Sequence, residues 1–74
     1  MNELFRDKNG RPVQVGDVLI WMAMVGWVHA PVLRYAPFED LPALWVRMPH
    51  GGDAPLFARD VAQIESEAAD VQPE

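Results

Sequence analysis

The chain has 74 residues, half of them hydrophobic, with no cysteine and a net charge of −5 at pH 7. A chain of this length forms one domain, and without cysteine it has neither a disulfide framework nor a thiolate metal site. Its longest apolar stretch, from Val18 to Val28, is too short to cross a membrane, and residues 1–7 lack the features of a secretory signal. We therefore expect a cytoplasmic protein.

The negative charge is concentrated in one part of the chain. Residues 1–59 carry equal numbers of basic and acidic side chains, whereas residues 60–74 carry acidic ones and no basic one. Because affinity for nucleic acid comes mainly from neutralised phosphates, this distribution disfavours nucleic-acid binding. We expect a single domain of residues 1–65 and a disordered acidic tail of residues 66–74, which acts as a solubilising terminus or as a decoy for a basic partner.

Two turn signals lie near the start of the chain. Asn9-Gly10 predicts a tight hairpin with a type I′ turn, which pairs residues 4–7 with residues 11–13. Gly16-Asp17 predicts a second turn, and the β-branched and aromatic residues of 17–24 indicate the first long strand. Both faces of this strand are apolar, so we expect its second face to be covered by another part of the chain, a second copy or a partner.

A second strand is predicted from Trp27 to Tyr35, after a turn or bulge at Gly26. Pro31 lies inside it and cannot donate to a ladder, so the strand must have an open edge there or break at a bulge. A loop at residues 36–42 follows, because this segment contains two prolines and two adjacent acids.

The third strand is predicted at residues 43–48, the most regular alternation in the chain. Its core face carries three apolar residues, Leu44, Val46 and Met48. In the preceding loop, Phe38 and Leu41 can fold back as a lid on the core.

The last elements are shorter. Residues 49–55 predict a hairpin loop, and residues 56–58 predict a short strand. The segment from Arg59 to Glu65 fits either a single helical turn begun by Asp60 or a closing strand through residues 61–64. We favour a brief 3₁₀ turn followed by a strand.

Four segments mark the successive strands: Val15-Gly16-Asp17-Val18, Gly26-Trp27-Val28, Leu44-Trp45-Val46, and Leu56-Phe57-Ala58 with Val61 and Ile64. Their order resembles the SH3-like barrels, including the KOW and Tudor-like kinds. The resemblance implies an all-β fold, a small barrel of about five strands with an N-terminal hairpin and a short 3₁₀ turn. Residues 9–17 also look like the start of many very small phage-encoded proteins.

The residue types present give little support for a catalytic function. Ser66 is the only serine, and the chain has one tyrosine and no threonine or cysteine, so side-chain nucleophiles are almost absent. His50 and Asp53 are expected to cap their own loop, and together with His29 they match no usual metal-ligand spacing. We expect no enzymatic activity, no cofactor and no metal site.

What remains is a candidate binding surface. The face of residues 43–48 opposite the core carries Trp45 beside Arg47, and tryptophan and arginine are enriched at interface hot spots. Neighbouring strands can add further residues of these types. The predicted binding residues are Trp21, Trp27, Arg34, Trp45 and Arg47.

The first long strand predicts an apolar patch because a small barrel has interior room for only one of its faces. We expect the patch to include Leu19, Trp21 and Ala23, joined by Trp45. Either a second chain covers it, as a homodimer or a tight partner complex, or the N-terminal hairpin does. In the second case the covering residues are Leu4, Phe5 and Val13.

The function that fits these observations is a non-catalytic protein-binding module. Its most concrete form is a small phage or mobile-element protein that binds and inhibits a host protein, such as a defence factor. One alternative is a KOW-like RNA- or DNA-binding module. Another is a small-molecule binder, including one that holds a cation in an aromatic cage. The aromatic residues available for such a site are Trp21, Trp27, Tyr35 and Trp45.

Overall fold

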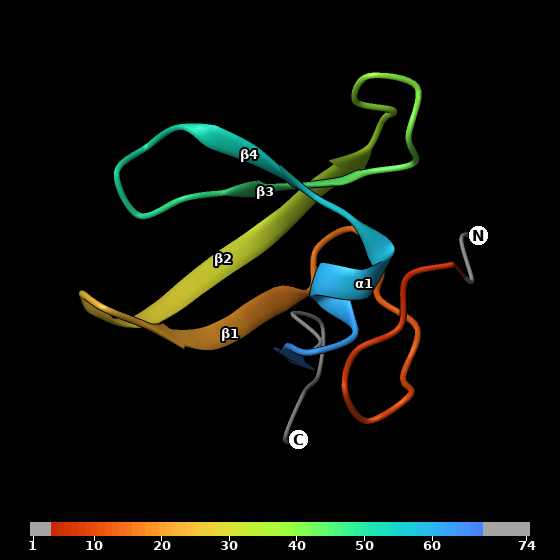
Figure 1. The fold of residues 1–74 in the computed structure, drawn as a ribbon. Coiled ribbons are helices and arrows are strands. Elements are labelled where there is room, and N and C mark those ends of the chain that lie inside the picture. The colour runs from red at the N-terminus through yellow and green to blue at the C-terminus, as the bar shows by residue number, and fades with distance from the viewer. Residues whose placement is uncertain (1–3, 68–74) are drawn as a thin grey trace.

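The computed structural model describes residues 4–67, which form one antiparallel sheet with a single helical turn (Figure 1). The elements in chain order are β1 (Val18–Ala23), β2 (Gly26–Tyr35), β3 (Leu44–Arg47), β4 (Asp53–Leu56), α1 (Ala58–Val61) and β5 (Glu65–Glu67). The five strands lie in the order β4-β3-β2-β1-β5. The predicted all-β class is therefore confirmed. In the described part of the chain, no helix is long and apolar enough to span a membrane.

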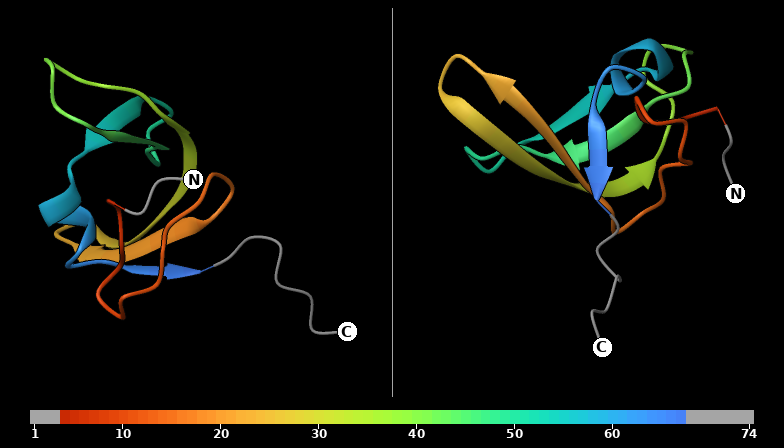
Figure 2. Two further views of the ribbon diagram at one scale, coloured as in Figure 1. Left: turned by 90° about the vertical axis from the view of Figure 1, so that its right-hand side faces the viewer. Right: turned by 90° about the horizontal axis from the view of Figure 1, so that it is seen from below.

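β2 is the long strand that joins the two halves of the curled sheet (Figure 2). It pairs with β1 through residues 26–31 and with β3 from Val32 onward, and its register shifts between Val32 and Arg34. Pro31 is the last residue of β2 that pairs with β1. The pairing of β2 with β3 begins one residue later, at Val32. The missing N–H of Pro31 therefore removes no bond to β3, and the irregularity comes just after this residue, as the open-edge prediction requires.

The core lies inside the curl of the sheet. Leu44 and Val46 are fully buried and Met48 packs against them, which confirms the predicted core face of β3. The N-terminal hairpin adds Phe5 and Val13, both buried, so two of the three predicted covering residues pack on the apolar strand, whereas the third, Leu4, is exposed. The remaining core residues are Leu19, Val28, Ala30, Val32, Val61 and Ile64.

The predicted outward face of β1 is wrong. Leu19 is fully buried, and Trp21 and Ala23 pack against the core. The opposite set, which includes Met22, faces outward instead. Both sets are apolar, so hydrophobicity did not distinguish them. Asp17, the residue before this strand, is buried, and its carboxylate accepts a hydrogen bond from the Gln14 N–H at 2.9 Å.

Two predicted local features also differ from the structure, a turn type and the start of a strand. The Asn9-Gly10 hairpin forms, with a bridge between Arg6 and Pro12, but only Gly10 has a positive φ, 81°. Its turn is thus type I followed by a left-handed glycine, not type I′. β4 begins at Asp53, inside the predicted loop, because a tight turn closes where the Met48 N–H donates to the Gly52 carbonyl at 2.7 Å.

The end of the described chain follows the predicted order of a turn and then a strand. The turn begins at Ala58 and is α-helical, so the predicted 3₁₀ turn is wrong in type, and the strand is β5. Ser66 and Glu67 belong to β5, so ordered structure continues two residues beyond the predicted domain end at residue 65. The rest of the predicted tail, residues 68–74, lies outside the described residues.

A buried carboxylate, that of Asp7, joins the N-terminal hairpin to β5. Its Oδ1 accepts hydrogen bonds from the N–H groups of Asn9 and Arg11, each at 2.9 Å. Its Oδ2 accepts from the Ser66 hydroxyl at 2.6 Å and from the Ser66 N–H at 3.3 Å. Burial raises the pKa of Asp7, but these hydrogen bonds, led by the Ser66 hydroxyl, outweigh burial and leave the pKa below its ordinary value.

This arrangement predicts an acid-labile fold. A carboxyl group whose folded pKa is depressed stabilises the native state above its unfolded pKa, about 3.9, and that contribution is lost as pH falls through the folded pKa. We expect Ser66→Ala and Asp7→Asn each to lower the free energy of unfolding near neutral pH by about 2 kcal/mol. Asp7→Asn should also flatten the fall in stability below about pH 5.

Urea unfolding at a series of pH values measures both effects. Glu39→Gln is the matched control, since Glu39 lies exposed in a turn far from Asp7 in sequence. Wild-type stability of Ser66→Ala, or an unchanged pH dependence in Asp7→Asn, would contradict the assigned role.

Candidate functional site

The predicted binding residues lie in three places. Arg34, Trp45 and Arg47 come together on the outer face of β2 and β3, next to β4. Trp27 is exposed at the end of the β1–β2 hairpin. Trp21 faces the other way and packs against the core, so it belongs to neither surface.

The first surface, the arginine–tryptophan cluster, consists of Arg34, Trp45, Arg47 and Asp53. The Arg34 guanidinium carbon lies 5.0 Å from the centroid of the Trp45 ring. Asp53 Oδ2 accepts a hydrogen bond from Arg34 Nη1 at 3.4 Å, and Asp53 Oδ1 lies 3.6 Å from Arg47 Nε. Asp53 is therefore a strand residue that pairs with two cations, and the prediction that it caps its own loop is wrong.

Trp45 is fixed in place by contacts on several sides. Its Nε1 donates a hydrogen bond to the Ala36 carbonyl at 2.9 Å. Its ring meets the edge of Phe38 at a centroid distance of 5.8 Å, and Phe38 in turn lies 6.3 Å from Phe57. Phe38 thus packs on Trp45 and Phe57 rather than on the core, and Leu41 is exposed, so the predicted lid on the core is wrong. These contacts leave Trp45 half-buried, so we assign it a structural role.

The second surface, which we call the hairpin tip, consists of Met22, Met24, Val25 and Trp27. Their exposed fractions are 57, 104, 89 and 64 %. Met22 and Trp27 are directly opposite each other in the register of β1 and β2, and Met24 and Val25 form the turn between the strands. This end of the ribbon lies far from α1 and from the N-terminal hairpin (Figure 1).

Sequence reasoning missed Met24 and Val25 because it placed the turn at Gly26. Gly26 is instead the first residue of β2, with a φ of 114° that a side chain would strain, and the two turn residues precede it. The available signal was the length of the apolar run. A run that extends through a turn must expose the apolar residues at the turn itself.

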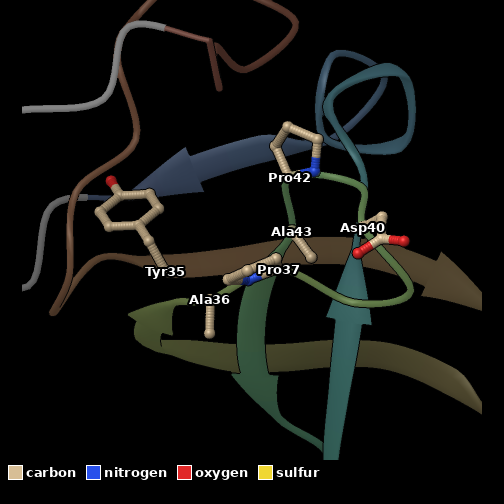
Figure 3. A pocket seen from close by; sticks show the side chains of 6 residues that line it. All are labelled: Tyr35, Ala36, Pro37, Asp40, Pro42 and Ala43. Atoms are coloured by element: carbon tan, nitrogen blue, oxygen red, sulfur yellow. The ribbon is translucent and has the colours of Figure 1, made fainter.

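A cavity of about 320 Å³ lies beside the loop between β2 and β3 (Figure 3). The Tyr35 ring and the Asp40 carboxylate lie on opposite sides of it. The Tyr35 hydroxyl donates to the Val13 carbonyl, and burial, with the nearby Asp17, raises its pKa, so it stays protonated at neutral pH. No tryptophan lines this cavity. The four aromatic residues considered for a cage are therefore not gathered in one site.

The loop between β3 and β4 shows no metal chemistry. His50 Nδ1 accepts a hydrogen bond from the Gly52 N–H at 3.2 Å, so it caps its own turn as predicted. His29 lies exposed on the outer face of β2. Within residues 4–67, no three side chains of metal-ligating type are grouped so as to hold an ion.

Compared with protein-family models, with curated proteins and with solved structures, the chain matches none of them. Function must therefore be inferred from the surface itself. Of its two candidate surfaces, the arginine–tryptophan cluster pairs its charges internally, whereas the hairpin tip leaves apolar side chains in water.

The stability of the protein should respond differently to the truncation of Trp45 and of Trp27 to alanine. Trp45→Ala removes a hydrogen bond and two ring contacts, so we expect the free energy of unfolding to fall by about 2–3 kcal/mol. Trp27→Ala, the matched control, should change it by no more than about 0.5 kcal/mol because Trp27 is largely exposed. Urea unfolding at low protein concentration gives both values. Equal losses in the two variants would contradict this division into a structural and a surface tryptophan.

Proposed function

We propose that this protein is a non-catalytic protein-binding module and that the hairpin tip is its contact surface. The observation that carries the proposal is the exposure of four neighbouring apolar side chains at the end of one ribbon. Contiguous exposed apolar surface on a small domain marks an interaction site. Tryptophan supplies a large anchor, and flexible methionine side chains adapt to the partner's surface.

The partner surface should be apolar rather than charged. The segment from Val18 to Leu33 contains no Asp, Glu, Lys or Arg, so the tip offers no carboxylate, ammonium or guanidinium group for an ion pair. A nucleic acid, which is bound through its phosphates, finds no cation there. The nearest alternative, the arginine–tryptophan cluster, pairs both guanidinium groups with the single carboxylate of Asp53, which leaves a net charge of only about one positive unit for phosphates. A KOW-like function is accordingly less well supported.

We also propose that the sheet is a small SH3-like barrel. Support comes from the curled five-stranded order, with β5 beside β1, and from the one-turn helix between β4 and β5. The resemblance of residues 9–17 to the start of small phage-encoded proteins suggests a phage or mobile-element source. A host protein in the cytoplasm, such as a defence factor, is then the partner that we propose, with inhibition by steric blocking as the mechanism.

The test is capture of a bacterial host protein by the tagged protein, with and without nuclease. We expect a captured protein that resists nuclease and is lost in Met24→Asp, since a carboxylate at the tip must be desolvated on binding. Arg47→Ala is the matched control, on the arginine–tryptophan cluster, and should retain the captured protein. Capture that depends on nucleic acid would favour the KOW-like alternative. Capture that is lost in Arg47→Ala but not in Met24→Asp would place the interface elsewhere.

A further inference from the structure

The distal half of β2 has a neighbouring strand on one side only. β2 pairs with β1 from Gly26 to Pro31, but its ladder to β3 begins at Val32. Toward their tips the β1–β2 and β3–β4 hairpins diverge, and this is visible in two directions of view (Figures 1 and 2). Among residues 4–67, no strand pairs with the second edge of β2 at residues 26–31.

The hydrogen bonds of β2 show which of its N–H and C=O groups point toward this open edge. The Val32 N–H donates to the Asp17 carbonyl at 2.8 Å, so the peptide groups of Val32 point toward the β1 side. Successive residues of an antiparallel strand alternate between the two sides. The N–H and C=O groups of Trp27 and His29 therefore point away from β1, and those of Val28 point toward it.

We propose that a second copy of this chain pairs with this edge, antiparallel, about a two-fold axis at Val28. Trp27 of each copy then lies opposite His29 of the other. In such a pair each N–H meets a carbonyl of the opposite residue, so the edge is complementary to itself. Pro31 limits the ladder because it has no N–H to donate.

Charge favours a second copy over a charged partner strand. The protein has a net charge of −5, so two copies repel each other over most of their surfaces. Between Asp17 and Arg34, however, the sequence has no Asp, Glu, Lys or Arg, and here two copies can approach without opposing carboxylates. On the outer face of the joined sheet, Trp27 of one copy lies beside His29 of the other, a favourable aromatic cross-strand pair.

The dimer uses one of the four residues of the hairpin tip, Trp27. Met22, on β1, and Met24, at the turn, take no part in the pairing and stay exposed. The dimer would therefore present both tips along one widened sheet. The inference holds or fails independently of the proposed partner, because it is tested on the purified protein alone.

The decisive variant is His29→Pro, with His29→Ala as its matched control. His29→Pro removes an N–H that faces the open edge and leaves the ladder to β1 intact, whereas His29→Ala removes only the side chain. We expect sedimentation velocity at micromolar concentrations to show a dimer for the wild type and for His29→Ala. In His29→Pro the dissociation constant should rise tenfold to a hundredfold, on the order of two lost hydrogen bonds. A monomeric wild type, or equal dimerisation of both variants, would overturn the proposal.

Disulfide trapping tests the register even if His29→Pro fails to fold. The chain has no cysteine, so introduced thiols are the only ones present. Opposite residues of a hydrogen-bonded antiparallel pair have Cα atoms about 5.5 Å apart, within the range of a disulfide. We expect the double variant Trp27→Cys/His29→Cys to form a covalent dimer on mild oxidation, and each single variant to form far less. Equal trapping of the single variants would overturn the register.

Discussion

The fold depends on one buried carboxylate. Asp7 binds the turn of the N-terminal hairpin through one oxygen and Ser66 of β5 through the other, across a separation of 59 residues. Lys8 adds a backbone bond from its N–H to the Ile64 carbonyl at 3.0 Å. In a cysteine-free chain of this length the core is small, and a charged hydrogen-bond cluster between distant segments takes the place of a covalent crosslink.

The exposed surface follows from what this contact covers. Held by Asp7, the N-terminal hairpin places Phe5 and Val13 against the inner face of the sheet, where Leu19 is buried. No corresponding element covers the outer face of β1 and β2 within the described residues. The apolar character of that ribbon therefore ends in exposed side chains at its tip. The outer face differs next to β4, where Asp53 pairs with Arg34 of β2 and Arg47 of β3.

Much of the fold could be predicted from local pattern. The alternation of residues 43–48 gave the correct core face, and Asn9-Gly10 gave a real hairpin. Two kinds of feature could not be predicted. The orientation of β1 was ambiguous because both its faces are apolar, so no periodic signal separates Leu19 from Met22. The pairing of Asp7 with Ser66 links positions that only the folded topology brings together.

The candidate site was predicted in part for similar reasons. Residue type identified Arg34, Trp45 and Arg47 as neighbours, because interface-prone side chains on adjacent strands share a face. It did not show that Asp53 pairs with both arginines, because the composition of residues 49–55 predicts a loop whereas Asp53 begins β4. The hairpin tip was missed because the turn was placed at Gly26 rather than at Met24 and Val25.

The long separation between Asp7 and Ser66 also has a consequence for synthesis on the ribosome. The β1–β2 ribbon makes only local contacts and can form as soon as residues 18–31 have emerged. Its inner face needs Val61 and Ile64, and the contact that holds the N-terminal hairpin needs β5, all of which are translated later. The inner face of the ribbon therefore stays incomplete until residues 61–67 have also emerged. During that interval its apolar surface is exposed and prone to aggregation.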